Sequence, residues 1–201
     1  MSHSIRLTYS IIIILLCLSV TALASLAQAS TAVKHGVVTW VYDGDTIQIQ
    51  GIGTVRLIGI DCPEKIETDR DWKYLRMGCK NRDTLRANSS DTLKKVIQLC
   101  KGKNVQLQGG SDKTDIYGRM LAYVWLPDGR MLNRIMLQEG CAMVYRRFNF
   151  IHKDDFIQLE SIARQQQRGI WSGVCKEDLE NAIDYSLDPQ DKKRAAHEHR
   201  Q

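Results

Sequence analysis

Thr54-Val-Arg-Leu-Ile-Gly-Ile-Asp-Cys-Pro-Glu64 is the stretch that decides the fold of this 201-residue chain. Its β-branched and apolar residues predict a strand that runs to Ile60. Arg56 interrupts that strand with a charge, and a guanidinium between apolar neighbours needs an anionic partner or a ligand. Asp61 and Glu64 leave the end of the strand and are fixed by Pro63. The stretch therefore predicts a strand that carries charged side chains to a site at its end.

The rest of the chain around this stretch is built from short strands, turns and a few helices. Gly51-Ile52-Gly53 predicts a hairpin turn between two of the strands, and residues 61–78 are polar and irregular. Such a pattern indicates an α+β domain, mainly β, that contains a small barrel. We expect strands at 36–42, 46–50, 54–60, 103–108, 120–126, 130–132 and 141–145, and helices at 80–100, 133–138 and 154–168.

The first 29 residues differ from everything that follows. They hold one charged side chain, Arg6, then an apolar run at 11–20, and they end in Ala27-Gln28-Ala29. This order is typical of a signal peptide cleaved before Ser30, which predicts a secreted or periplasmic protein. The alternative is an uncleaved membrane anchor over residues 11–29, a length that just spans a bilayer. We therefore expect a leader at 1–29, a globular domain at 30–173 and a polar tail at 174–201.

Five cysteines remain after the leader, and an odd number leaves at least one thiol unpaired within the chain. An exported protein can form disulfides, and the favoured pair is Cys79–Cys100, which brackets the helix expected at 80–100. The alternative is that all five are ordinary thiols, namely Cys62, Cys79, Cys100, Cys141 and Cys175. The spacing of the cysteines and histidines does not match a structural zinc site.

The positive charge of the chain is concentrated in the globular domain. The whole chain has 28 Lys and Arg against 23 Asp and Glu, a net +5. Residues 30–173 hold 22 of these bases and 16 of these acids, a net +6, whereas residues 174–201 have a net −2. A basic domain is suited to a polyanionic partner such as nucleic acid.

Three segments place polar groups beside strands: Asp43-Gly-Asp-Thr46, Arg56 to Glu64, and Asp115-Ile-Tyr-Gly-Arg119. Carboxylates such as Asp45 and Asp61 are hard ligands that suit Ca²⁺ or Mg²⁺. Arginine forks suit phosphate oxygens, and a spare carboxylate can act as a base toward water. The combination indicates phosphoryl transfer to water, although the same residues could form a structural ion-pair network.

These segments resemble the staphylococcal nuclease (thermonuclease) family in type and order. The resemblance extends from about residue 37 to residue 172 and includes Leu132-Asn133, Glu139-Gly140 and Gly169-Ile-Trp171. It implies a five-stranded OB-type barrel with about three helices. It also implies a Ca²⁺-dependent endonuclease that hydrolyses DNA and RNA with low sequence specificity, with the 5′ oxygen as the leaving group.

The resemblance also implies roles for individual residues. Asp45 and Asp61 would be the carboxylate ligands of Ca²⁺, and the backbone carbonyl of Cys62 would supply another oxygen. Glu64 would activate or orient the attacking water. Cys62 stands where the best-known member has threonine, but only its carbonyl is required.

The remaining implied roles concern the substrate. Arg56 and Arg119 would hold the scissile phosphate and its developing charge. Tyr117 matches a tyrosine near the terminal phosphate of the nucleotide. The paired tyrosines that stack on a base are not clearly reproduced, and Tyr145 is near one such position.

The sequence supports three hypotheses about function. The leading one is an exported monomeric nuclease that favours single strands of DNA or RNA, because OB-type barrels bind unpaired bases by charge and stacking. The second is a catalytically weak module of the same fold that binds nucleic acid or protein; against it, all five charged positions are present. The third is an anchored surface protein in which the nuclease fold is incidental.

Overall fold

The computed structural model describes residues 33–173, apart from the side chains of residues 111 and 112. The predicted leader or anchor, the polar tail and Cys175 lie outside these residues. Of the helices described, none combines the length and the apolar character needed to cross a membrane.

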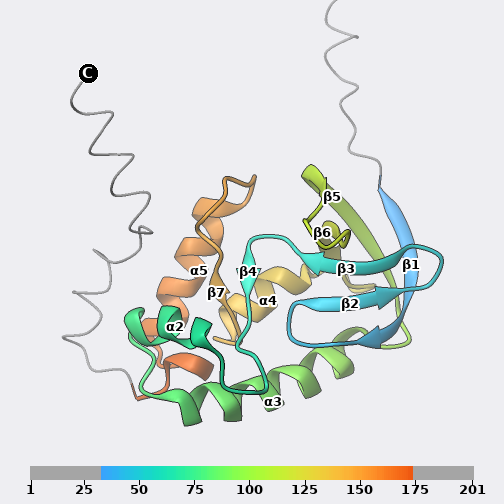
Figure 1. The fold of residues 1–201 in the computed structure, drawn as a ribbon. Helices are drawn as coiled ribbons and strands as arrows, with labels where there is room; N and C mark the ends of the chain where they lie inside the picture. The colour runs from blue at the N-terminus through green and yellow to red at the C-terminus, as the bar shows by residue number, and fades with distance from the viewer. Residues whose placement is uncertain (1–32, 174–201) are drawn as a thin grey trace, which may run out of the picture. The chain divides into compact units, whose positions relative to one another are not determined.

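Five strands form a closed barrel, as predicted (Figure 1). Around the barrel the order is β1-β2-β3-β6-β5, and β1 pairs with β5 to close it. The β3–β6 pair is parallel and the other neighbours are antiparallel. The strands are β1 (Lys34–Val41), β2 (Thr46–Ile49), β3 (Gly53–Leu57), β5 (Asn104–Thr114) and β6 (Met120–Trp125).

The β2–β3 hairpin has the predicted turn. Gly51 and Gly53 have φ values of 73° and 108°, which favour glycine. Ile47 and Val55, which are paired across the hairpin, are buried in the core. Arg56 follows Val55, so the alternation of the strand turns it to the outer side of the sheet.

Helices cover the barrel and fill the space beside it. Figure 1 shows α3 (Arg82–Cys100) running along the bottom of the view and beneath the barrel, and α4 (Leu132–Gln138) lying between α5 (Lys153–Gln165) and the barrel. The side chain of Asn81 begins α3 by accepting the amide N–H of Thr84 at 2.9 Å. These three helices match the three predicted ones to within a few residues.

A fourth α-helix corrects the prediction for residues 61–78, which are not wholly irregular. The 3₁₀ turn η1 (Asp69–Asp71) leads into α2 (Trp72–Arg76). Asp71 is buried and forms an ion pair with Arg86 of α3 at 2.8 Å. A five-residue helix is too short to show a hydrophobic period, and its tertiary contacts hold it in place.

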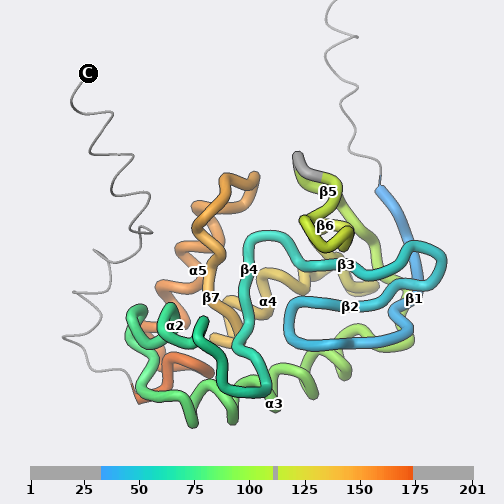
Figure 2. The backbone as a smooth tube through the Cα atoms, in the orientation of Figure 1, coloured from blue at the N-terminus to red at the C-terminus, as the bar shows by residue number. Residues whose placement is uncertain are grey.

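The strand predicted to reach Ile60 breaks at Gly59. Gly59 has a φ of 77°, and a Cβ there would lie 2.6 Å from the ring of Phe150. Beyond this break β4 (Ile60–Asp61) pairs with β7 (Met143–Val144) in a separate two-stranded sheet. The backbone then continues from β4 toward α2 (Figure 2). The break thus places Asp61 on a different sheet from Arg56.

The segment at 130–132 is also not a full strand. It makes one isolated bridge, from Met131 to Trp125, and α4 begins at Leu132. Asn133 in α4 is buried, and its side chain joins two segments. It accepts the N–H of Val124 at 3.0 Å and donates to the carbonyl of Ile58 at 2.9 Å.

Gly140 and Gly169 bring the end of α4 against η2 (Gly169–Trp171). The N–H of Ile170 donates to the carbonyl of Gly140 at 2.9 Å. A Cβ at Gly140 would lie 2.2 Å from the carbonyl oxygen of Arg168, and a Cβ at Gly169 would lie 2.2 Å from the carbonyl oxygen of Gly140. This close approach accounts for both glycine motifs and for the complete burial of Trp171.

The predicted Cys79–Cys100 disulfide is wrong. Cys62, Cys79, Cys100 and Cys141 are buried free thiols. Cys79 precedes the 19-residue helix α3 and Cys100 ends it, so the rise of the helix separates them by about 28 Å. A disulfide requires Cα atoms about 6 Å apart.

Candidate active site

Arg56 lies at the centre of a group of charged side chains where β2 begins and β3 ends. Its guanidinium forms an ion pair with Asp45, and its Nη2 donates to Oδ1 of Asp61 at 3.1 Å. The register of β2 and β3 sets Thr46 opposite Arg56, which places Asp45 beside the arginine. Three residues predicted from two of the charged segments thus meet around one guanidinium.

The loop before β2 fixes Asp45. The carboxylate of Asp43 accepts the N–H of Asp45 at 2.9 Å. Asp45 is 2% exposed, and its Oδ2 accepts the N–H of Cys62 at 2.9 Å. A Cβ at Gly44 would lie 2.5 Å from Thr92 of α3 and 2.6 Å from the thiol of Cys62. Gly44 is therefore required for close packing, beyond the turn that an Asp-Gly pair commonly forms.

Burial and the neighbouring charges together set the pKa values of Asp45 and Arg56. Loss of hydration raises the pKa of Asp45 to about 7, with Arg56 opposing the rise and Asp43 and Asp61 adding to it. Burial alone would lower the pKa of Arg56, but Asp45 and Asp61 outweigh it and raise that pKa. Two carboxylates share this one guanidinium, so a further cation beside them is favourable, and Lys73 of α2 supplies one.

Arg119 is linked to the same group through Thr46. Nη1 of Arg119 donates to Oγ1 of Thr46 at 3.3 Å, and that hydroxyl donates to Asp45 at 3.0 Å. Asp115 holds the arginine by accepting from its Nε and Nη2, both at 2.7 Å. Burial would raise the pKa of Asp115, but the hydrogen bonds from Arg119 and from the backbone outweigh it and lower that pKa.

Two residues of α2 complete the surroundings of Asp61, and sequence reasoning missed both. Oδ2 of Asp61 accepts the phenol O–H of Tyr74 at 2.8 Å and forms an ion pair with Lys73. Tyr74 is 2% exposed, and burial beside Asp61 raises its pKa well above the ordinary value. Lys73 thus adds a second cation to the carboxylates. An aromatic residue after a lysine in a polar segment was the one signal available.

The other predicted residues lie outside this network of hydrogen bonds. The side chain of Glu64 is 42% exposed and forms an ion pair with Arg70 at 3.0 Å. Tyr117 is 76% exposed, and the guanidinium of Arg119 lies 5.4 Å from the centre of its ring. Tyr145 follows β7 and donates its N–H to the carbonyl of Gly59 at 2.9 Å, while its ring is 5.8 Å from that of Phe148.

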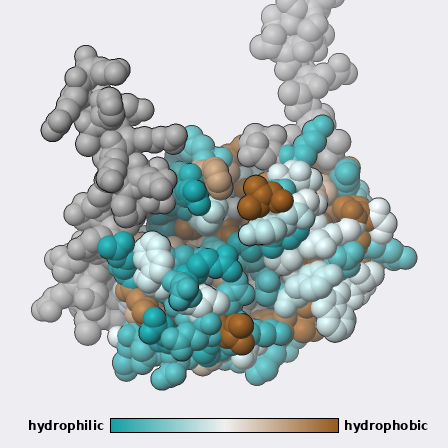
Figure 3. Space-filling view, viewed as in Figure 1, coloured by the Kyte–Doolittle hydropathy of each residue, from teal (hydrophilic) through white to brown (hydrophobic). Residues whose placement is uncertain are grey.

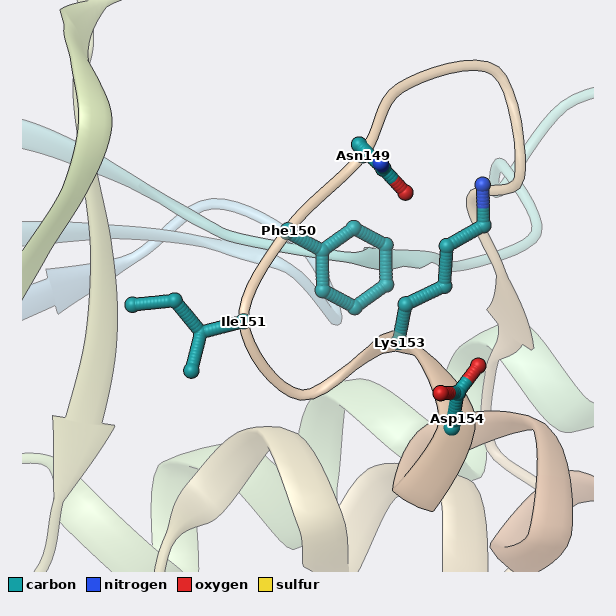
Figure 4. Close-up of a pocket in the computed structure, with 5 residues that line it drawn as sticks. All are labelled: Asn149, Phe150, Ile151, Lys153 and Asp154. Carbon is teal, nitrogen blue, oxygen red and sulfur yellow. The ribbon is translucent and has the colours of Figure 1, made fainter.

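A hollow beside the start of α5 is lined by none of the predicted site residues. Figure 4 shows the ring of Phe150 and the side chains of Lys153 and Asp154 around it. Nζ of Lys153 donates to the carbonyl of Arg146 at 3.0 Å. This hollow is formed by the loop before α5 and the first turn of α5, whereas the charged network is formed by the barrel, β4 and α2.

The donor set suits a hard divalent cation. Within residues 33–173 there is no group of three or more His, Cys, Asp or Glu side chains arranged to hold a metal. Two carboxylates, Asp45 and Asp61, nevertheless converge on one guanidinium, and the backbone N–H of Cys62 donates to Asp45. Carboxylate and carbonyl oxygens, completed by waters and substrate, match the preferences of Ca²⁺. The residues present therefore fit the ion.

Comparison with known proteins identifies the same family as the sequence motifs. The family described as "Staphylococcal nuclease homologue" matches residues 54–173. A protein of Escherichia coli O157:H7 named "Uncharacterized endonuclease" is 35% identical over 142 residues, covering 69% of this chain and 77% of its own. A thermonuclease of Staphylococcus intermedius is 33% identical over 139 residues, covering 65% and 72%. A thermonuclease of Staphylococcus hyicus is 29% identical over 136 residues, covering 66% and 72%.

The family match includes most of β3 with Arg56, β4 with Asp61, and the segment that carries Arg119. The closed five-stranded barrel agrees with the fold that the resemblance implied. This chain belongs to the family of staphylococcal nuclease homologues.

Proposed function

We propose that the chain is a Ca²⁺-dependent nuclease that hydrolyses DNA and RNA with low sequence specificity. Its family and the names of its relatives support nuclease activity. The observation that carries the finer proposal is the chain of contacts from Arg119 through Thr46 and Asp45 to Arg56 and Asp61. It joins two phosphate-binding side chains to two metal-binding ones.

The two arginines would bind the scissile phosphate. A guanidinium has five N–H donors. Arg56 donates two hydrogen bonds to carboxylates, and Arg119 donates three to Asp115 and Thr46. Both side chains are partly exposed, at 20% and 25%. Each arginine therefore keeps donors for phosphate oxygens while its carboxylate partners hold it in place.

Asp45, Asp61 and the carbonyl of Cys62 would hold the metal ion. Bound Ca²⁺ would supply positive charge next to the second negative charge that the phosphate gains as water adds. Arg56 and Arg119 would stabilise the same charge from the barrel side. Because Lys73 pairs with Asp61, it would move aside or share that carboxylate.

Glu64 would take or orient the proton of the attacking water. Its exposed carboxylate is paired only with Arg70, so rotation of the side chain breaks a weak surface contact. The bond to the 5′ oxygen would then break, leaving a 3′-phosphate and a 5′-hydroxyl. Tyr117 and Tyr145 remain candidates for contact with the nucleotide.

The proposal includes export. Its support is the order of charge, apolar run and small residues within residues 1–29. Terminal sequencing of the protein from the host is expected to begin near Ser30. An intact Met1 in the membrane fraction would favour the anchor instead.

The test of the proposed activity is hydrolysis of single-stranded DNA and of RNA by the purified protein, with Ca²⁺ or with EGTA. Digestion is expected with Ca²⁺ alone, and the new ends should be 5′-hydroxyls. Arg119→Ala should reduce the rate strongly, whereas Arg130→Ala should not. Arg130 is a matched control because it forms the same kind of paired contact, with Asp128, in an exposed turn.

A further inference from the structure

We propose that the outward side of β1, β2 and β3 is a stacking surface for single-stranded nucleic acid that extends the substrate path away from Arg56. This inference rests on the nuclease function proposed above. We call the surface the outer barrel face; its residues are Trp40, Tyr42, Gln48, Thr54 and Lys101.

The outer barrel face is continuous with the candidate active site. Thr54 and Arg56 are two residues apart on β3 and point outward together, about 7 Å apart along the strand. Thr54 pairs with Gln48 of β2, and Gln48 pairs with Trp40 of β1. One row of side chains therefore crosses the sheet immediately beside the arginine that would hold the phosphate.

Hydrogen bonds hold this row in place. Oε1 of Gln48 accepts the hydroxyl of Thr54 at 3.0 Å and the phenol of Tyr42 at 3.2 Å. The hydroxyl of Tyr42 thus anchors its ring to β2. Tyr42 itself comes just after β1, beyond the bulge between Val38 and Trp40. An aromatic ring fixed before binding loses little conformational freedom when a base stacks on it.

Two large aromatic side chains on this face are half-exposed without being needed in the core. Trp40 is 53% exposed and Tyr42 is 48% exposed. Nζ of Lys101 lies 4.7 Å from the centre of the Trp40 ring. An indole beside a lysine combines the two contacts that single strands use, base stacking and attraction of the phosphate.

The strands of the outer barrel face carry no carboxylate that would repel a polyanion. Strands β1, β2 and β3 carry Lys34 and Arg56 and no acidic residue. Figure 3 shows that the side chains over β2 and β3 are mostly pale, neither strongly polar nor strongly hydrophobic. Such a surface suits bases and sugars with no preference for one sequence.

The experiment compares one pair of substitutions with a matched control. Trp40→Ala with Tyr42→Ala removes both rings. Trp72→Ala removes an indole on α2 that is 50% exposed and also lies beside a basic side chain, Arg76. The first readout is the anisotropy of a labelled oligothymidylate of about 12 nucleotides in EGTA, which prevents cleavage. The second is the ratio of kcat/KM for that oligonucleotide to kcat/KM for bis(p-nitrophenyl) phosphate, which is too small to reach the face.

The double substitution should weaken oligothymidylate binding about tenfold or more and lower the kcat/KM ratio to a similar extent. Trp72→Ala should change neither readout, and Trp40→Phe should retain most of the binding. Wild-type affinity in the double variant would overturn the inference, as would equal loss on both substrates. A third outcome would also overturn it: the wild type is a dimer, and the double substitution dissociates this dimer without changing the affinity for oligothymidylate. The face would then bind a second copy of the chain. If the wild type hydrolyses neither substrate, the nuclease proposal fails, and the anisotropy still decides on the stacking surface.

Discussion

Arg56 and Asp45 form an ion pair that joins β3 to the loop before β2, across a separation of 11 residues. Asp45 is nearly inaccessible, at 2% exposed, so its charge depends on the guanidinium beside it. The same guanidinium reaches Asp61 on the second sheet. One arginine therefore connects the barrel to the segment that carries the other candidate ligand.

Removal of this arginine should affect stability and catalysis together. Arg56→Met leaves Asp45 and Asp61 without their shared partner, which should lower the free energy of unfolding by roughly 3–5 kcal/mol in EGTA. Saturating Ca²⁺ should restore part of that loss, because the ion would neutralise the same carboxylates. Cleavage should fall about 10²–10³-fold. Urea unfolding with and without Ca²⁺ checks the stability, and equal stability of both proteins in EGTA would contradict the assigned role.

Glu64 should show the opposite pattern. Glu64→Gln removes an exposed carboxylate whose ion pair with Arg70 contributes at most about 1 kcal/mol, so thermal unfolding should barely change. The kcat for oligonucleotide cleavage should fall by about 10²–10⁴ because the proton acceptor is lost. Glu67→Gln is the control, since Glu67 is also exposed and paired with an arginine, Arg82. Equal activity of the two variants would rule out Glu64 as the base.

Lys73 should compete with the metal ion for Asp61. Its ammonium is paired with the carboxylate that Ca²⁺ would bind, so Lys73→Met should make Ca²⁺ binding severalfold tighter. Isothermal calorimetry measures this directly in the absence of substrate. Lys95→Met, which removes a lysine paired with Glu139, is the control and should leave the Ca²⁺ affinity unchanged. Weaker Ca²⁺ binding by the Lys73 variant would mean that the lysine supports the site.

Asp115 should contribute stability that depends on pH. Its pKa in the folded protein lies below the ordinary value, so its contribution is present above that ordinary value, about 4, and is lost as the pH falls through the folded pKa. Asp115→Asn should therefore lower the free energy of unfolding at pH 7, by about 1 kcal/mol for a partly exposed pair. The difference from wild type should shrink as the pH falls below the ordinary value toward the folded pKa, and a difference that stays constant as the pH is lowered would contradict this account.

The barrel and the charged network were predictable because their signals are local. Val55 and Leu57 alternate with Thr54 and Arg56, and Gly51 and Gly53 mark the turn. Arg56 in an apolar strand required a partner, and Asp45 and Asp61 provide it. The glycine motifs at 140 and 169 were also visible, but their reason, contact between two backbones, appears only in three dimensions.

The rest depends on contacts distant in sequence. Helix α2 is five residues long, and burial of Tyr74 against Asp61 positions it, which no periodic pattern reveals. The pairing of Cys79 with Cys100 failed because residues that flank a long helix are far apart in space. Strand β3 was expected to continue past Gly59, and the ring of Phe150, far along the chain, is what accounts for the break.

The most direct test of the central claim is the rate of cleavage of single-stranded DNA as Ca²⁺ is titrated, for wild type and for Arg119→Ala. The account predicts no cleavage in EGTA, saturable activation of the wild type by Ca²⁺, and a rate about 10²–10³-fold lower for the variant at saturating Ca²⁺. Equal Ca²⁺-dependent rates for the two proteins, or cleavage by the wild type that persists in EGTA, would contradict it.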